Sequence, residues 1–519
     1  MNRIPTKAGT REWLGLAVLA LPALLTSIDV SVMILALPRI ATQLGADSAE
    51  QLWIMDIYGF LIAGFLITMG TLSERVGQRK LLIIGGTVFG LASLLAAFSQ
   101  NVEMLIVARA ILGISGATLF PTTFALVSHL FQDQKQRSFA LGLYMTFCMG
   151  GMALGPLVGG AMLEYFWWGA IFLPAVPVMI ILLTVAPFLL PEFRNPEAKQ
   201  IDLWSVLLSL GTILLVIYGV KEIAKDGFQL VSIVVMIIGI VLGILFIRRQ
   251  KQVTNPLLDL RLFSNSVFRV SLGGMFSITL TGAFMLFVSQ YFQFVQGLSP
   301  LQAGLWTLPS VIASMLGSFF APLIARRIRP AYLIAFGMII SMTGMLFVFQ
   351  LTVTSGLAIV VIAHILFNVG ASPLTSLSSG LVAESVPQEK VGSAGSMLQT
   401  SGELAFAVGI ATIGSLGTAV YRHQITDYLP AHLPPKTVQS VQESIAGAVE
   451  VAKRLSNSIG SELLSNAYHA FINGMIAVSL VCGLIYVMIA FVFLKQMRHI
   501  LPIGTPQDSK DYQKQYPVT

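Results

Sequence analysis

The stretch that decides the fold is GGMALGPLVGG, residues 150–160, which lies inside an apolar run over residues 139–163. A run of this length crosses a bilayer as a helix, because about 20 apolar residues span the hydrocarbon core. Pro156 removes a backbone donor and predicts a kink. A stripe without side chains, which lets a second helix approach closely in a membrane, is formed by Gly151, Gly155, Gly159 and Gly160. Plain helix packing is the simpler interpretation of this stripe.

The composition indicates a polytopic membrane protein rather than a soluble globule. Of 519 residues, 55% are hydrophobic and 11% are charged, whereas soluble domains have about 25% charged residues. The mean hydropathy of +0.81 agrees. The net charge of +7 does not indicate a nucleic-acid partner, because the basic residues cluster in short loops between apolar runs. Cys148 and Cys482 fall in apolar runs and indicate neither a disulfide nor a metal site.

Fourteen apolar runs predict an all-α protein with fourteen transmembrane helices and both termini on one side. The loops richest in Lys and Arg place that side in the cytoplasm. The first run is preceded by basic residues without a small-residue cleavage pattern, so we predict an uncleaved first helix. The runs are 13–37, 51–72, 80–98, 104–128, 139–163, 167–190, 203–221, 229–248, 268–292, 303–325, 331–351, 356–380, 392–417 and 470–494.

The order of the runs predicts two six-helix halves, residues 1–190 and 267–494, joined by a linker with two inserted helices, residues 191–266. Similar basic turns, LSERVGQRKLL from Leu72 and LIARRIRPAYL from Leu323, agree with two halves, although topology alone can produce them. Apolar positions at helical spacing predict a helical hairpin on the outer face over residues 421–469, split near residues 458–460. A loop without fixed structure is the alternative. Residues 495–519 are a polar cytoplasmic tail.

Two of these stretches resemble motifs of the major facilitator superfamily drug exporters. Residues 151–160 resemble the fifth-helix antiporter motif, and the resemblance implies a packed seam between the two halves that prevents uncoupled leak. Residues 70–82, GTLSERVGQRKLL, resemble the loop after the second helix, which implies a latch for the inner gate. Glu74 replaces the usual aspartate there, and topology alone would explain the basic residues. The candidate gate residues are Gly70, Glu74, Arg75, Gly77 and Arg79.

The first half also resembles the fourteen-helix drug:proton antiporter family, in particular QacA-type quaternary-ammonium exporters. IDVSVMILALP, residues 28–38, contains Asp29, and QLWIMDIYGFLIAGF in the next run contains Asp56. LIVARAILGISG, residues 105–116, resembles the fourth-helix motif centred on Arg109. The resemblance implies a major facilitator fold and a role for Arg109 in proton handling. A structural tie from Arg109 to carbonyls or a carboxylate remains the alternative.

Three carboxylates lie inside apolar runs and are candidate sites for proton coupling and substrate binding: Asp29, Asp56 and Glu403. Ionisable groups within a membrane usually mark a transport pathway. A carboxylate in an apolar cavity binds either a proton or a cation, so one acid can exchange the two. Asp29 and Asp56 lie towards the outer end of their helices, where plain contact with water is the alternative.

The sequence therefore predicts a proton-coupled multidrug efflux transporter that exports lipophilic cations, such as quaternary ammonium biocides and dyes, in exchange for protons. A same-fold exporter of a fatty acid, bile acid or peptide-like metabolite is the alternative, and repeated halves argue against a channel. The expected partners are these cations, protons and membrane lipid, with no nucleic acid, no metal and no cofactor beyond the proton gradient. We expect a monomer in a bacterial plasma or inner membrane. The sequence contains no catalytic triad pattern or phosphate-binding loop, so no enzyme is predicted.

Overall fold

A computed structural model of the chain describes residues 8–46, 48–194, 202–226, 229–253, 256–353, 356–429, 434–455 and 457–503. The regular structure in these ranges is helical. Thirteen helical segments among them are long and apolar enough to span a membrane, by length and composition. α5 (Gln134–Tyr165) is a further helix of 32 residues over the fifth predicted run. Each of the fourteen predicted runs therefore lies on helical structure, and the all-α polytopic fold is confirmed.

The first part of the chain forms one group of packed helices. α1 packs along α5, and α2 packs along α4. Polar side chains start two of these helices, because Asn101 accepts from Met104 N at 2.8 Å and Asp133 accepts from Gln136 N at 2.9 Å. The group consists of α1 (Thr10–Leu44), α2 (Ser48–Val76), α3 (Gln78–Ala97), α4 (Val102–Leu130), α5, the short η1 (Trp168–Phe172) and α6 (Ala175–Leu189).

The later part forms a second group, in which α12 and α11 both pack on α13, and α12 packs on α18. The predicted span 392–417 is divided by a π-helical segment at residues 410–414, and the span 268–292 is divided by a turn at residues 281–282 and ends in a π-helical segment that begins at Tyr291. The group consists of η2 (Leu260–Ser264), α9 (Ser266–Leu280), α10 (Ala283–Gln290), η3 (Tyr291–Val295), α11 (Pro300–Ile324), α12 (Pro330–Val348), α13 (Leu357–Glu384), η4 (Gln388–Lys390), α14 (Val391–Gly409), η5 (Ile410–Gly414), α15 (Ser415–Thr426) and α18 (Asn457–Met497).

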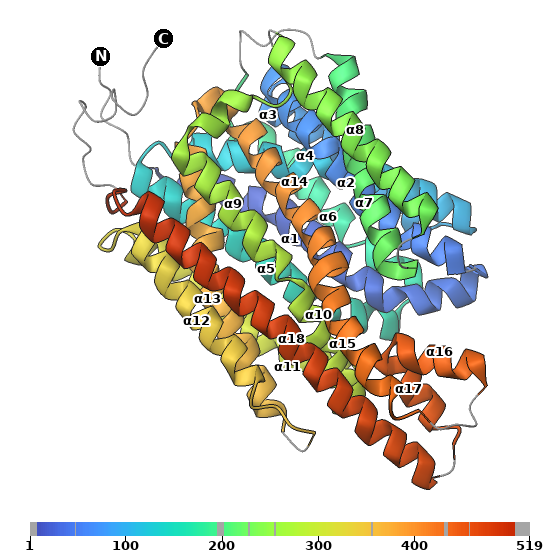
Figure 1. Cartoon of the computed structure of the whole chain (residues 1–519). Helices are drawn as coiled ribbons and strands as arrows, with labels where there is room; N and C mark the ends of the chain where they lie inside the picture. Colours follow the sequence, from blue (N-terminus) through green and yellow to red (C-terminus); the bar gives the residue numbers. More distant parts are fainter. Residues whose placement is uncertain are drawn as a thin grey trace, which may run out of the picture.

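The two inserted helices, α7 (Leu203–Asp226) and α8 (Leu230–Gln252), pack on each other along the edge of the bundle (Figure 1). α7 also contacts α2 of the first group and α14 of the second. A small apolar cluster joins the three helices through Phe60 and Ala63 of α2, Ile217 of α7 and Ala407 of α14. The inserted pair therefore covers the line along which the two groups meet.

Most described residues of the 421–469 region are helical, and the chain leaves helical structure at residues 453–455, just before the predicted split near residues 458–460. α16 (Pro435–Glu443) and α17 (Ile445–Ala452) form a short pair, and residues 458–460 lie within the long α18. A Cβ added at Gly460 would lie 2.6 Å from Ala452 O. Gly460 therefore allows α18 to pack on the end of α17 and does not interrupt the helix.

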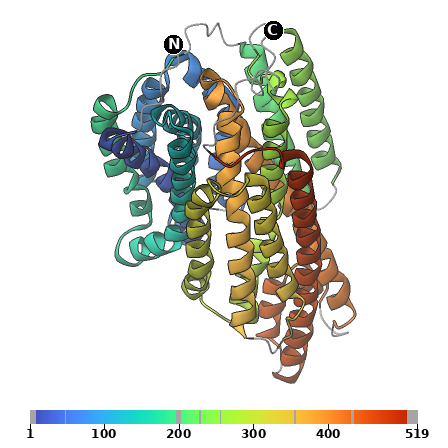
Figure 2. The same ribbon diagram turned by 90° about the vertical axis from the view of Figure 1, so that its left-hand side faces the viewer.

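Two opposite ends of the bundle are named here by their residues. The Gly77 face is the end that carries the turn between α2 and α3, and the hairpin face is the end that carries α16 and α17 (Figure 1). Figure 2 shows that α18 extends along the bundle towards the hairpin face. α2 runs from the hairpin face to the Gly77 face, and α14 runs in the opposite direction.

Candidate functional site

Arg109 is the centre of a buried ionic site in the first group of helices. Its side chain on α4 is 1% exposed, its Nη1 lies 2.8 Å from Asp29 Oδ2 of α1, and its Nε donates to Ile54 O of α2 at 3.1 Å. The guanidinium carbon also lies 4.6 Å from the centre of the Tyr58 ring. An unpaired charge at mid-membrane costs roughly 2.5–3.5 kcal/mol even on a lenient scale. The carboxylate, the carbonyl and the ring offset that cost.

Glu403 is the candidate acid of the second group of helices. It is half-buried on α14 and accepts a hydrogen bond from Gln399 Nε2 at 3.0 Å. Leu404, the next residue, packs against the apolar cluster that contains Phe60 and Ala63 of α2. Glu403 therefore lies on the part of α14 that packs on α2, the helix that carries Tyr58. Asp56 lies on α2, two residues before Tyr58, and its side chain is outside the described part of the chain.

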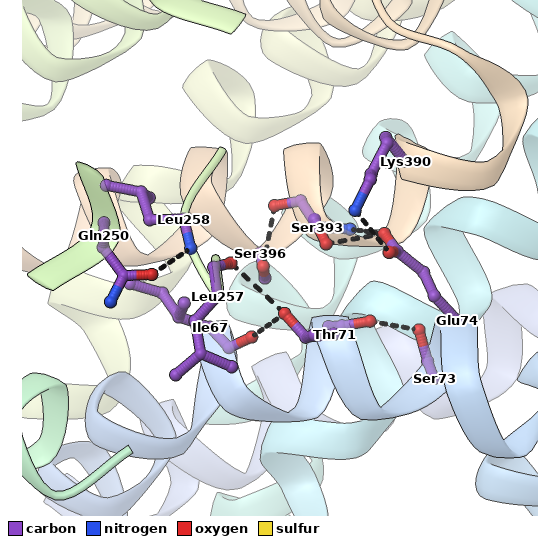
Figure 3. Close-up of polar contacts among 11 residues, drawn as sticks. Ile67, Thr71, Ser73, Glu74, Gln250, Leu257, Leu258, Lys390, Ser393 and Ser396 are labelled. Carbon is purple, nitrogen blue, oxygen red and sulfur yellow. Dashed lines mark hydrogen bonds and ion pairs between the residues drawn. The ribbon is translucent and has the colours of Figure 1, made fainter. Parts of the chain in front are cut away.

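Glu74 joins the two groups at the Gly77 face. Its buried carboxylate accepts from the backbone N and the Oγ of Ser393 at 2.9 Å and 2.6 Å, and it lies 3.6 Å from Lys390 Nζ (Figure 3). Ser393 is in the first turn of α14, where unpaired backbone N–H groups favour an anion. The glutamate thus reaches across from α2 and caps a helix of the other group.

Glycine makes this crossing close enough to bond. A Cβ added at Gly70 would lie 2.8 Å from Ser396 Cβ of α14 and 3.1 Å from Gly392 O. The hydroxyl of Ser73 bonds within its own helix, because Ser73 Oγ donates to Gly70 O at 2.6 Å (Figure 3). Any side chain at position 70 would push α2 and α14 apart at the Gly77 face.

The remaining residues of the predicted gate loop interact within the first half. Gly77 has φ 114°, a left-handed conformation that favours glycine, and it starts α3. Glu192 accepts from the backbone N of Arg79 and of Lys80, both at 3.1 Å, and its Oε2 lies 3.5 Å from Arg79 Nε. Arg75 is half-buried in the last turn of α2. Glu192 therefore caps α3 as Glu74 caps α14.

A second polar contact between the groups lies at the same face. Glu384, at the end of α13, accepts from Gln134 Nε2 at 2.9 Å and lies 3.6 Å from Arg137 Nη2. Both partners are in the first turn of α5. Together with the contact at Glu74, this pair holds the two groups of helices together at the Gly77 face.

The glycine stripe of α5 packs within the first group. A Cβ added at Gly155 would lie 2.8 Å from Ser31 Cβ of α1, and one added at Gly159 would lie 2.8 Å from Val32 Cγ1. The same stripe continues through Gly151, which also faces α1, while Gly160 is half-buried on α5. The sequence predicted that this stripe forms a seam between the two halves. That prediction is wrong for Gly151, Gly155 and Gly159, because their neighbour is α1 of the same half. The side chain of Pro156 is outside the described part.

Two other glycines of α5 form the contact with the second half. A Cβ added at Gly142 would lie 2.7 Å from Pro322 Cγ of α11, and one added at Gly150 would lie 3.2 Å from Met315 Cε. The first of these glycines precedes the quoted motif, so the resemblance did not indicate it.

The inserted pair is connected to the same face by hydrogen bonds. Gln250 of α8 donates to Ser205 Oγ of α7 at 2.7 Å and accepts from Leu258 N at 3.2 Å. Thr71 of α2 donates to Leu257 O, the adjacent residue, at 3.2 Å (Figure 3). These bonds form a tether that runs from the inserted pair to α2, one turn from Glu74.

Comparisons with known proteins agree with this architecture. A family model described as Major Facilitator Superfamily matches residues 19–410. The chain belongs to this superfamily. It is therefore a multi-pass membrane transporter and not an enzyme, as the sequence predicted.

Two curated relatives extend over most of the chain. The chain is 39% identical over 481 residues to the multidrug efflux pump LfrA of Mycolicibacterium smegmatis, which covers 92% of this chain and 95% of that protein. It is 34% identical over 471 residues to the methyl viologen resistance protein SmvA of Salmonella typhimurium, with 89% and 93% covered. A solved bacterial homolog of the human lysosomal transporter Spinster matches with a TM-score of 0.57 at 16% identity, covering 94% of this chain and 99% of that one. This last likeness concerns the fold alone.

Proposed function

We propose that the protein is a proton-coupled efflux transporter that exports lipophilic cations. Relatives named as a multidrug efflux pump and a methyl viologen resistance protein support drug efflux. The observation that carries the proton and cation part is the buried pair of Asp29 and Arg109 at 2.8 Å, with Glu403 of the other half on the part of α14 that packs on α2. This site therefore combines ionisable groups from both halves.

Competition for the carboxylates supplies the coupling. In an apolar site a carboxylate is stabilised either by a bound proton or by a nearby cation. A cationic drug that approaches Glu403 stabilises the ionised form and releases the proton, and a returning proton releases the drug. Asp29 takes part through its pairing with Arg109, because protonation of Asp29 removes that ion pair.

Exchange between two sides of a membrane requires a gate, and we propose that the Gly77 face is the cytoplasmic gate. Glu74 and Glu384 each bridge the two halves there. With cytoplasmic termini, these contacts close the inner side, so the structure corresponds to an outward-facing state. The protein is proposed to act as a monomer in a bacterial cell membrane.

A same-fold exporter of an anionic amphiphile, such as a fatty acid or bile acid, is the competing function. An anion would need a cationic group that points into the site. The guanidinium of Arg109 is instead engaged by Asp29 and Ile54 O. This arrangement favours cationic substrates.

The test is efflux measured in inverted membrane vesicles. Ethidium uptake is followed with a proton gradient imposed and then collapsed by an ionophore. Proton coupling predicts uptake that stops on collapse, together with proton release when ethidium is added without a gradient. Uptake that continues unchanged after collapse would reject proton coupling. Transport of taurocholate but not ethidium would favour the anionic amphiphile.

A further inference from the structure

His364 is a buried histidine of the second half in which one ring nitrogen has no partner. It lies on α13, and its side chain is 2% exposed. Its Nδ1 lies 2.9 Å from Ser310 Oγ of α11, and its Nε2 has no hydrogen-bond partner among the residues that the structure describes. Buried polar atoms nearly always have a partner, so an exception requires a reason.

The hydrogen bonds of Ser310 determine where the ring carries its hydrogen. Ser310 Oγ donates its single hydrogen to Thr307 O at 2.6 Å. The same oxygen can therefore only accept from His364, so Nδ1 carries a hydrogen. A buried charge without a counter-charge is costly, so the ring in this structure is neutral. In a neutral ring with its hydrogen on Nδ1, the Nε2 atom has a free lone pair and is a base.

The contact between α11 and α13 continues with polar pairs that do not titrate. Two turns further along both helices, the Oγ atoms of Ser372 and Ser314 lie 3.4 Å apart. α11 contains no ionisable residue, and α13 contains only His364 and, at its opposite end, Glu384. His364 is therefore the group on this contact at which a proton can bind.

Among the described residues, no ionisable group of a neighbouring helix forms a hydrogen bond or ion pair with His364. α5, α9, α11, α12 and α14 pack on α13, and rings of α10 and α18 contact Phe367, one turn from His364. His364 is the eighth residue of α13, about 10 Å from the end at the hairpin face. The ionisable residues of these helices are, at the Gly77 face, Arg269 of α9, Tyr332 of α12 and the first-turn residues of α5, and elsewhere Tyr144, Cys148 and Glu164 of α5, Glu403 of α14, and Cys482 and Tyr486 of α18.

We propose that Nε2 of His364 is a proton-binding site of the transport cycle, separate from Asp29, Asp56 and Glu403. The bound proton makes the ring an imidazolium. Its Nδ1–H keeps Ser310 Oγ as acceptor, and its new Nε2–H requires water or another acceptor. With cytoplasmic termini the hairpin face is the outer side, so the proton comes from outside.

The sign of the coupling follows from charge. A proton on His364 is a positive charge in the half that carries Glu403, so it disfavours a cationic drug there, and the drug disfavours the proton. Drug release to the outside is then accompanied by proton uptake, as exchange requires. This inference rests on the proposed function and adds a proton site to it.

Solid-state ¹⁵N NMR of the full-length protein in lipid vesicles, with labelled histidine, tests the site directly. His364→Gln identifies the His364 signals by their absence. We expect a neutral ring with its hydrogen on Nδ1 at the upper end of the range between about pH 5 and 8, and a charged ring at the lower end. Ethidium added to the charged form should return the ring to the neutral form. The signal of His423, which is exposed on α15, is the control and should titrate without responding to ethidium.

Proton release on ethidium binding separates a proton site from a structural tie between helices. His364→Gln keeps a polar side chain that does not titrate in this range. We expect it to bind ethidium but to release fewer protons for each ethidium bound, with the loss following the NMR titration of His364. Ser341→Ala is the matched structural control, because Ser341 Oγ of α12 is buried and donates to Phe367 O of α13 at 2.9 Å. Its loss should lower thermal stability and leave the proton count unchanged.

Three results would overturn the site. The first is a His364 ring that remains neutral at every pH, as a buried water that donates to Nε2 would keep it. The second is a charged ring that does not respond to ethidium, and the third is a His364→Gln protein with the unmodified proton count. Each of these leaves proton release from the carboxylates in place. If the unmodified protein releases no protons when ethidium binds, the proposed function itself fails, and the assignment of His364 to the cycle fails with it.

Discussion

Arg109 and Glu403 differ in how they are held, and this difference assigns them different tasks. Arg109 is 1% exposed and is engaged by Asp29, Ile54 O and the Tyr58 ring, all from the first half. Glu403 is half-buried and receives a hydrogen bond from Gln399, one turn away on its own helix. A side chain held by three neighbours can serve as a permanent counter-charge. A half-buried acid can bind a ligand that enters and leaves the site.

Neutral amides test this assignment, because they keep the side-chain shape and remove the charge. We expect Glu403→Gln to abolish export of both ethidium and methyl viologen, and Asp29→Asn to impair both. Asp56→Asn should impair methyl viologen more, because a dication needs two counter-charges. The measurements are cell survival and substrate-induced proton release for each variant.

The control for these amides is Glu164→Gln. Glu164 is exposed near the end of α5, so its loss should leave export of both cations unchanged. If Glu403→Gln and Asp29→Asn also export both cations at the unmodified rate with proton release intact, these carboxylates are not the coupling site.

The sequence identified Asp29 and Arg109 as candidates but did not predict that they pair. They are separated by 80 residues in the chain, and their contact depends on how α1 packs beside α4. Ser393, the partner of Glu74, is 319 residues away and carries no motif of its own. Tyr58 was missed because only the folded structure reveals that its ring lies under the Arg109 guanidinium. Its position two residues after Asp56 was the only available signal.

Among the helices, the contact of α5 with α1 depends on glycine. We expect Gly155→Leu to lower ethidium efflux more than about tenfold, since a leucine there would overlap Ser31, and overpacking costs about 1–3 kcal/mol. Gly273→Leu is the matched control, because a Cβ added at Gly273 meets nothing within 4 Å. Efflux is compared at equal amounts of each protein in the membrane. Normal efflux by Gly155→Leu would mean that the α1–α5 contact can widen without functional cost.

Beside the hydrogen bonds of the tether, an ion pair joins the start of α7 to α8. Asp202 forms an ion pair with Arg249 at 2.5 Å, and the hydrogen bonds from the Arg249 side chain lower the pKa of Asp202 from 3.8 to about 2. Arg249 is 39% exposed, so solvent screens this pair. Its contribution is present above the ordinary pKa and is lost only as pH falls through about 2. Changes of pH near neutrality therefore leave the ion pair intact.

Gln250 is 3% exposed, and its loss would leave Leu258 N without its acceptor, while Ser205 Oγ would keep its hydrogen bond to Asp202 Oδ2. An unsatisfied buried group costs about 1–3 kcal/mol. We expect Gln250→Ala to lower the thermal unfolding temperature of the purified protein and to reduce efflux about fivefold. Asp202→Asn is the comparison variant and should change both by much less. An equal effect of the two variants would show that the buried hydrogen bonds are not what holds the pair against α2.

For the molecule as a whole, hydropathy predicted the spans because bilayer thickness sets their length. All fourteen predicted runs lie on helices. Hydropathy carries no information about which helix lies beside which, so the contacts of α7 with both α2 and α14 could not be predicted. The π-helical segments η5, which divides one span, and η3, which ends another, were also missed, because hydropathy does not distinguish them from the flanking helices.

The orientation in the membrane is the prediction on which every role assigned to a side depends. Lys and Arg gather on the Gly77 face, where Arg326, Arg327 and Arg329 lie between α11 and α12, and such residues remain in the cytoplasm. Single cysteines at two exposed positions, Ser440 of α16 and Arg327, test this in a background in which Cys148 and Cys482 are replaced by serine. An impermeant maleimide added to intact cells should label Ser440→Cys and should label Arg327→Cys only after the membrane is opened. The reverse pattern would place Glu74 and Glu384 on the outside, and the contacts of the Gly77 face would then close the outer gate instead of the inner one.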